Sequence, residues 1–285
     1  MDMFGDLHLH THHSDGTFTP EELVERAVGA GLHTIALTDH DTLDGCAEAK
    51  RAAESRGLGF VIGTELTAEE SGVEIHVLGY FLDPNNSALI ETTSRLQAAR
   101  VNRIHEMCAR LTAHGAPLDP ELVFEVARCR APGRPHVARA MVRARVCDSL
   151  DDAFSNFLQK DGPGWAPKYR ISLEEAIALI HGAGGLAVFA HPALSRRDDL
   201  LPRLTEMGLD GLECSHSKHR GVDAKRYTRL AKEHDLLITG GSDCHGFSRR
   251  TPLIGSVKLH EGHLRRFLEA GGFPADPTEK ESPTE

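Results

Sequence analysis

The amino-acid sequence predicts an α/β protein with a mainly parallel sheet, because short apolar runs alternate with segments of helical periodicity. Each apolar run has the length and composition of a buried strand. These runs cover residues 4–9, 34–38, 59–63, 186–190, 211–214 and 236–239. Helical segments lie between several of them, so parallel pairing is expected in a sheet that is either open or closed.

Capping signals support the helices. Thr19 and Glu22 form a capping box, with Pro20 at the first helical position. Ser172 and Glu175 repeat the capping box before a second helix. Further helical segments are expected at 44–57, 222–235 and 261–272.

The alternation of strands and helices is interrupted between about residues 83 and 167, where long helical periodicity replaces it. We expect an all-helical subdomain there, beside a sheet domain formed by residues 1–82 and 168–272. The remaining segment, 273–285, is rich in proline and charge, and we expect it to be disordered.

The composition argues against several kinds of protein. The formal net charge is −10 and no block of basic residues stands out, so capture of duplex nucleic acid is not expected. No signal peptide or long apolar span is evident, so association with a membrane is not expected. The sequence also gives no sign of an obligate protein partner. The six cysteines have no CxxC spacing, which favours reduced, structural thiols in the cytoplasm. They are Cys46, Cys108, Cys129, Cys147, Cys214 and Cys244.

Side chains that bind metals gather near the carboxyl ends of the predicted strands. His8 and His10 lie two residues apart on the first strand, so both point to one face. The others stand after later strands, in an alternating run at 73–81 and in the loop after the first strand: His40, Glu65, His191, Asp243, His245, His76 and Asp15. Active sites of α/β sheets form at this edge, so we predict that all nine bind metal there.

Ten other histidines lack this placement, and we expect them to be ordinary surface or core side chains. They are His12, His13, His33, His105, His114, His181, His219, His234, His260 and His263.

The runs "DLHLHTHHSDGT", "ALTDHDT", "GTELT", "HVLGY", "AHP" and "GSDCHG" resemble the PHP (polymerase and histidinol phosphatase) family of metal-dependent phosphoesterases. The resemblance implies a distorted (β/α)7 barrel with a helical insertion that covers the active site and three metal ions. It assigns the first ion to His8, His10, Glu65 and Asp243. It assigns the second to Asp15, His40 and His245, and the third to Glu65, His76 and His191, with Glu65 bridging.

The charges of such a site favour phosphate chemistry. Three divalent ions bring six positive charges and the three carboxylates remove three, which leaves an excess suited to a phosphate dianion. Metal ions about 3.5 to 4 Å apart can lower the pKa of a bridging water and direct the hydroxide in line at phosphorus. Imidazole and carboxylate ligands without cysteine suit manganese, iron or zinc better than copper. Of these three we expect manganese, with iron or zinc as alternatives.

Substrate residues are expected in and beside the insertion. Arg134 in "GRPHVARAMV" and Lys168 in "GWAPKYR" resemble elements of a subgroup that hydrolyses nucleoside 3′,5′-bisphosphates or trims RNA from its 5′ end. There they would hold a substrate phosphate, and the guanidinium offers two parallel donors for that purpose. His216, at another strand end, is a further candidate for phosphate binding or for protonation of the leaving oxygen.

We therefore predict a phosphatase acting on nucleoside 3′,5′-bisphosphates, such as 3′-phosphoadenosine 5′-phosphate, and on 5′ ends of short single-stranded RNA. Histidinol-phosphate hydrolysis is the alternative, less favoured because Asp15 stands where such enzymes usually place a histidine. A non-catalytic metal-binding or polymerase-associated module and a metal-dependent amidohydrolase are the remaining hypotheses.

Overall fold

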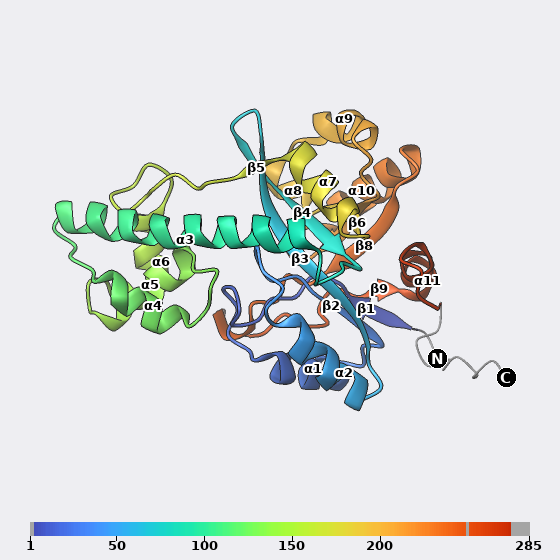
Figure 1. Ribbon diagram of the computed structural model, residues 1–285, viewed down its shortest axis with the longest axis horizontal. Coiled ribbons are helices and arrows are strands. Elements are labelled where there is room, and N and C mark those ends of the chain that lie inside the picture. Colours follow the sequence, from blue (N-terminus) through green and yellow to red (C-terminus); the bar gives the residue numbers. More distant parts are fainter. Residues whose placement is uncertain (1–2, 249–250, 275–285) are drawn as a thin grey trace.

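The computed structural model describes residues 3–248 and 251–274, which fold into a mixed sheet surrounded by helices (Figure 1). The strands of these residues are β1 (Phe4–Asp6), β2 (Thr34–Leu37), β3 (Gly59–Glu70), β4 (Val73–Tyr80), β5 (Ile171–Ser172), β6 (Leu186–Phe189), β7 (Gly211–His216), β8 (Leu237–Gly241) and β9 (Leu259–His260). In the described part of the chain they form one sheet in the order β8-β7-β6-β4-β3-β2-β1-β9, with β5 paired to β3. The tail expected at 273–285 lies outside the described residues from position 275 onward.

The α-helices are α1 (Pro20–Gly29), α2 (Cys46–Ser55), α3 (Ser87–Ala113), α4 (Pro120–Ala127), α5 (Arg134–Arg143), α6 (Leu150–Asp152), α7 (Leu173–Gly182), α8 (Pro192–Ser195), α9 (Leu201–Glu206), α10 (Gly221–Glu233) and α11 (Glu261–Ala270). Shorter helical pieces are the π-helix η1 (Ala153–Leu158) and the 3₁₀-helices η2 (Asp198–Leu200) and η3 (Gly246–Ser248). Both predicted capping boxes, before α1 and before α7, are confirmed. Within the described residues, no helix is long and apolar enough to cross a membrane.

The two ends of the sheet meet and close a distorted barrel. Beyond the end of β1, the amide of Leu7 donates to the carbonyl of Gly240 at 3.2 Å, and the amide of Asp243 donates to the carbonyl of His8 at 2.9 Å. These bonds join the continuation of β1 to β8 and the chain after it. The strands from β8 to β1 thus form the barrel, and β9 pairs antiparallel with the start of β1. The predicted distorted α/β barrel is confirmed.

The sheet is less parallel than the apolar runs predict. β4 pairs antiparallel with both β3 and β6, so an alternating segment is inserted between two parallel groups. β3 is twelve residues long, rather than ending at residue 63, because β4 pairs with it along its outer half. The first strand ends at Asp6 rather than at residue 9, since the chain turns there toward the segment after β8.

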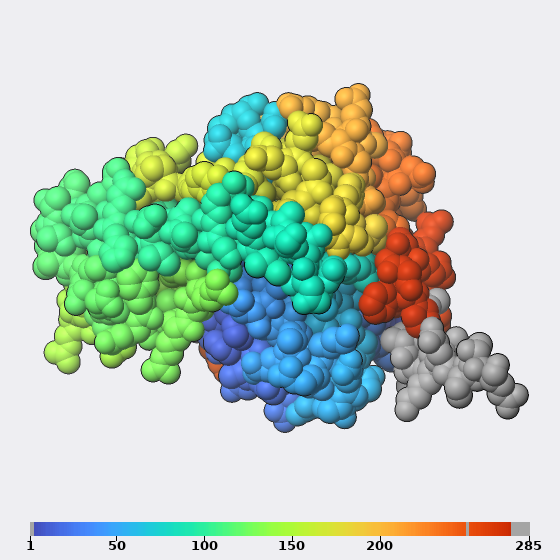
Figure 2. Space-filling view, viewed as in Figure 1, coloured from blue at the N-terminus to red at the C-terminus, as the bar shows by residue number. Residues whose placement is uncertain are grey.

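The helices between β4 and β5 form a lobe beside the barrel (Figures 1 and 2). α3 runs from the barrel into the lobe, where its second half packs on α4 and α5 through an apolar cluster of its own. Members of this cluster include Ile104, Met107, Leu111, Val137 and Met141. The domain boundaries at 82/83 and 167/168 stay predictions.

Candidate metal centre

The nine predicted ligands come together at the end of the barrel to which the parallel strands point. Glu65 lies at the centre and is 1% exposed. Its Oε2 atom lies 3.2 Å from His8 Nε2 and 3.1 Å from His40 Nδ1. Its Oε1 atom lies 2.6 Å from His76 Nδ1 and 2.9 Å from His191 Nε2. One carboxylate therefore connects histidines from four separate parts of the barrel.

A second carboxylate, Asp243, connects the ligands on the other side of the cluster. Its Oδ1 atom lies 3.3 Å from His10 Nε2 and 3.3 Å from His245 Nδ1. His245 Nε2 in turn lies 3.0 Å from Asp15 Oδ1, in the loop after the first strand. His10, Asp15, His40 and His245 form one group whose ligand atoms all lie within 4.8 Å of one another.

This donor set fits divalent cations. Three further groups meet the same 4.8 Å criterion: His8, His10 and Asp243; His40, Glu65 and His76; and His8, Glu213 and His216. Both ring nitrogens of the fully buried His10 lack a hydrogen-bond partner among the described residues. A buried imidazole without partners is costly, and coordination of a cation would satisfy it. Among the described residues, none of the ten histidines expected to be ordinary belongs to such a group.

The electrostatics favour the ligating form of several side chains. Burial would raise the pKa of Glu65, but the facing His40, His76 and His8 outweigh it and hold the pKa well below its usual range. Burial lowers the pKa of His40 to about 3, so this ring is neutral and has a free electron pair. Burial also opposes protonation of His245, yet Asp15 and Asp243 raise its pKa to about 9. Cations and protons would thus compete at this ring.

Glu213 on β7 was missed by the sequence analysis. It is fully buried and accepts hydrogen bonds from His8 Nδ1 at 2.9 Å and from the backbone amide of His191 at 2.7 Å. The first bond places the ring proton of His8 on Nδ1 and leaves Nε2 to face Glu65. The second holds His191 in a left-handed conformation with φ of 30°. The signal available in the sequence was a single glutamate within the apolar segment 211–214, which suggests a buried carboxylate with a partner.

His216 and Lys218 lie next to the cluster. His216 Nε2 lies 3.3 Å from Asp243 Oδ2, and the ring is buried. Lys218 Nζ donates to the same Asp243 oxygen at 3.0 Å. Lys218 could not be predicted from the sequence, because nothing in an exposed loop segment indicates that the side chain reaches the cluster.

Of the two predicted phosphate-binding cations, the structure places Lys168 beside the cluster. Its Nζ lies 3.0 Å from Glu74 Oε1, and the same oxygen lies 2.9 Å from His76 Nε2. Arg134 makes no direct contact with Lys168 or with the nine ligands in the described part of the chain. Its Nη1 donates to the carbonyl of Leu158 at 3.3 Å, inside the helical lobe.

Two further cations on α3 also face this region. Arg100 donates from Nε to Asp41 Oδ2 at 2.7 Å, and both side chains are buried. Arg103, 9% exposed, donates from Nε to the carbonyl of Ala166 and contacts no carboxylate within the described residues. Burial, with the nearby Arg134 and Arg100, lowers the pKa of Arg103 to about 10. An unpaired buried guanidinium of this kind suits an anionic ligand.

A barrel that carries a histidine–carboxylate cluster at the ends of its strands defines a metal-dependent hydrolase. The sequence model of the PHP domain family matches residues 6–117 of this chain. The chain is 33% identical to a 3′,5′-nucleoside bisphosphate phosphatase of Chromobacterium violaceum, with 84% of this chain and 86% of that protein covered. It is therefore a member of the PHP family of metal-dependent phosphoesterases.

Other relatives have different names. The chain is 32% identical to the 5′-3′ exoribonuclease Rnm of Escherichia coli, with 84% of each protein covered. It is 33% identical to a phosphoribosyl 1,2-cyclic phosphate 1,2-diphosphodiesterase of Eggerthella lenta, covering 89% of this chain and 98% of the relative. A Bifidobacterium adolescentis protein of known structure, assigned as a metal-dependent phosphoesterase, has a TM-score of 0.86 and 38% identity; the match covers 93% of this chain and 95% of that one.

Proposed function

We propose that this protein removes a phosphate from nucleoside 3′,5′-bisphosphates and releases 5′ nucleotides from short single-stranded RNA. The observation that carries the proposal is the position of Lys168, which reaches the metal-ligand cluster through Glu74 and His76. A substrate with one phosphate at the cluster could present a second phosphate to this cation. Relatives named as a nucleoside bisphosphate phosphatase and an exoribonuclease support this substrate class.

The nine side chains would hold three divalent cations, and their nitrogen and oxygen donors suit Mn²⁺, with Fe²⁺ or Zn²⁺ as alternatives. Such cations supply an activated water and neutralise charge on the reacting phosphate. Glu65 would bridge, because each of its oxygens faces a different pair of histidines. Glu213 would fix the orientation of the His8 ring and the backbone of His191 through its two hydrogen bonds.

The helical lobe would cover the site and bind the second phosphate. Lys168 and Arg134 are the cations expected from the sequence, and the structure adds Arg103, which has no carboxylate partner among the described residues. Arg134 lies close enough to Arg103 to lower its pKa. An anion placed between these cations would relieve their mutual repulsion. His216, which adjoins Asp243, would contact the reacting phosphate or its leaving oxygen.

A second candidate function is hydrolysis of a cyclic phosphodiester, favoured by the relative from Eggerthella lenta that matches over nearly its whole length. The same cluster could attack a phosphodiester, and the phosphomonoester of the phosphoribosyl group could then contact Lys168 and Arg103. A direct comparison of substrates therefore distinguishes the two functions. The free cysteines are compatible with the proposed cytoplasmic location.

The test offers the Mn²⁺-loaded protein four substrates at equal concentration. These are 3′-phosphoadenosine 5′-phosphate, a 5′-phosphorylated RNA pentamer, histidinol phosphate and phosphoribosyl 1,2-cyclic phosphate. We expect the highest kcat/KM for the first two. The variant Lys168→Met should raise KM for the bisphosphate about tenfold, the loss of one charge-assisted contact. Lys160→Met, an exposed lysine in the same lobe, is the matched control. A preference for histidinol phosphate or the cyclic ester would overturn the proposal.

A further inference from the structure

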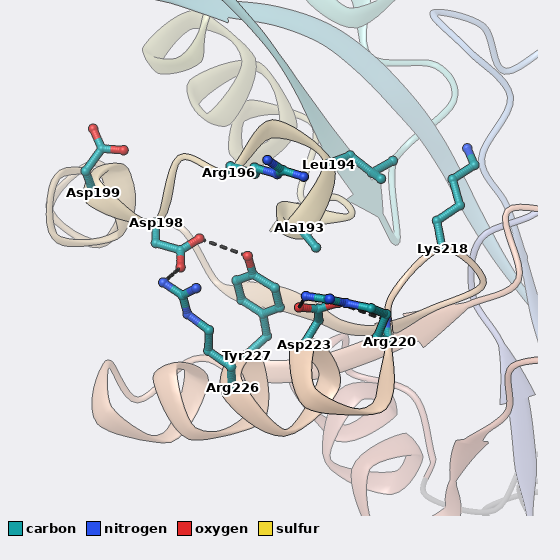
Figure 3. A pocket seen from close by; sticks show the side chains of 10 residues that line it. All are labelled: Ala193, Leu194, Arg196, Asp198, Asp199, Lys218, Arg220, Asp223, Arg226 and Tyr227. Carbon is teal, nitrogen blue, oxygen red and sulfur yellow. Dashed lines mark hydrogen bonds and ion pairs between the residues drawn. The ribbon is translucent and has the colours of Figure 1, made fainter.

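A polar groove of about 720 Å³ lies between the α8 segment and α10 (Figure 3). Four cationic and three acidic side chains line it, together with Ala193, Leu194 and Tyr227: Arg196, Lys218, Arg220, Arg226, Asp198, Asp199 and Asp223. None of its lining residues belongs to the helical lobe, and Lys168 is not among them.

The groove is connected to the metal-ligand cluster at two points. Lys218, on its rim in Figure 3, donates to Asp243 at 3.0 Å. α8, which supplies Ala193 and Leu194 to the wall, begins directly after the candidate ligand His191. A molecule bound at the cluster can therefore extend into the groove past Lys218.

The carboxylates of the groove are already neutralised by arginines. Arg226 pairs with Asp198, Arg220 pairs with Asp223 at 3.0 Å, and the third carboxylate, Asp199, accepts from Arg197 at 2.9 Å.

Two cations of the lining remain for a ligand. The guanidinium of Arg196 has no ion pair or hydrogen bond with any described residue. Figure 3 shows Arg196 on the opposite side of the groove from Tyr227. Within the described residues, the ammonium of Lys218 contacts only Asp243, a candidate metal ligand. The groove thus presents an excess of positive charge in a protein of net charge −10.

We propose that this groove binds the backbone of single-stranded RNA beyond the reacting phosphate, an inference that rests on the proposed nucleotide phosphoesterase function. A nucleoside bisphosphate has two phosphates, which the cluster and the Lys168 side can accommodate. Lys168 reaches the cluster through Glu74, whereas Lys218 reaches it through Asp243. A third phosphate, present only in a longer chain, would therefore contact Lys218 and Arg196.

The groove is suited to the sugar–phosphate backbone rather than to bases. Tyr227, the one aromatic residue among its lining residues, is 3% exposed and its hydroxyl donates to Asp198. A buried ring cannot serve as a stacking platform, which is how single strands are held through their bases. Binding should accordingly be independent of sequence and sensitive to salt.

The test compares Arg196→Glu with wild type on two substrates, the RNA pentamer and 3′-phosphoadenosine 5′-phosphate. Arg196 is exposed and unpaired within the described chain, so the variant should keep the wild-type melting temperature. We expect kcat/KM for the pentamer to fall about tenfold and the bisphosphate value to stay within about twofold. The slope of log kcat/KM against log salt should become shallower by about 0.7 for the pentamer. Lys225→Glu, an equal charge reversal at an exposed position of α10 outside the groove lining, should change the kcat/KM of neither substrate.

Direct binding separates failure of this inference from failure of the proposed function. Fluorescence anisotropy of a labelled pentamer, measured with wild type and both variants in chelator, reports the groove without turnover. An unchanged pentamer affinity in Arg196→Glu, or an equal loss of activity on both substrates, would overturn the groove assignment. Wild-type protein that hydrolyses neither substrate would refute the proposed function; the groove would then be supported only if Arg196→Glu still weakened pentamer binding.

Discussion

Replacing Glu213 by glutamine tests how the cluster is held in place. The carboxylate uses one oxygen for His8 Nδ1 and the other for the amide of His191. Both partners are donors, and a glutamine has one acceptor oxygen and one donor amino group. The substitution keeps size and shape, yet it must place an N–H group against one of these two donors.

Either orientation of the glutamine disturbs a candidate metal ligand. If its amino group faces His8, the ring must accept at Nδ1 and carry its proton on Nε2, the atom that faces Glu65. If the amino group of the glutamine instead faces the backbone amide of His191, the hydrogen bond that holds the left-handed conformation of His191 is lost. Loss of one such outer contact typically costs about 10- to 100-fold in metal affinity, or roughly 1.4 to 2.7 kcal/mol.

The assay is metal retention during dialysis against a graded chelator series, with the bound metal measured by elemental analysis. Glu213→Gln should lose metal at about 10- to 100-fold lower chelator strength than wild type. Glu213→Asp, which keeps two acceptor oxygens, should recover part of the affinity. Glu206→Gln on the exposed surface of α9 is the control. Equal retention by Glu213→Gln and wild type, with both folded, would refute this reasoning.

Three further predictions concern stability. Asp41→Asn leaves the buried guanidinium of Arg100 without its carboxylate, so unfolding in urea should show a loss of about 3 to 5 kcal/mol, and a loss below 1 kcal/mol would contradict it. Burial lowers the pKa of His136 to about 4, below its ordinary value near 6.5, so its stabilising share is present above pH 6.5 and is lost as the pH falls toward 4. Between pH 7 and pH 5 wild type should therefore lose roughly 2 kcal/mol more than His136→Asn, which keeps an acceptor for the amide of Gly133; equal losses would show that the imidazole does not titrate this way. Chelation of bound metal should lower the melting temperature, and re-addition at 100 times Kd should restore about 2.7 kcal/mol; an unchanged melting temperature would argue against metal in the folded state.

The clustering of the candidate ligands could be predicted because several of them follow a strand. His40 comes three residues after β2, His191 two residues after β6, and Asp243 two residues after β8. Parallel strands bring their carboxyl ends to one edge, so sequence order alone places these groups together. Glu65 was expected after a strand and instead lies within β3, but it forms a bridge with His40 and so reaches the same edge.

The supporting residues could not be predicted, because their roles depend on partners far along the chain. Glu213 is 205 positions from His8, and Arg100 is 59 positions from Asp41. A single glutamate in a strand, or an arginine in an amphipathic helix, has the same local pattern whether it is solvated or paired in the interior. Only the folded chain shows which of these charges is buried.

The distribution of charge is compatible with the proposed binding of a polyphosphorylated substrate by an acidic chain. The carboxylates of the cluster face histidines, whereas cations from two different parts of the chain contact its edge: Lys168 contacts Glu74 beside the cluster, and Lys218 contacts Asp243 within it. A negative overall charge does not favour long-range attraction of nucleic acid, so binding depends on these local contacts. Local contacts discriminate between substrates by the number and spacing of their phosphates. For this reason we expect selectivity among short phosphorylated substrates to depend on the lobe and the groove, while the cluster supplies the common chemistry.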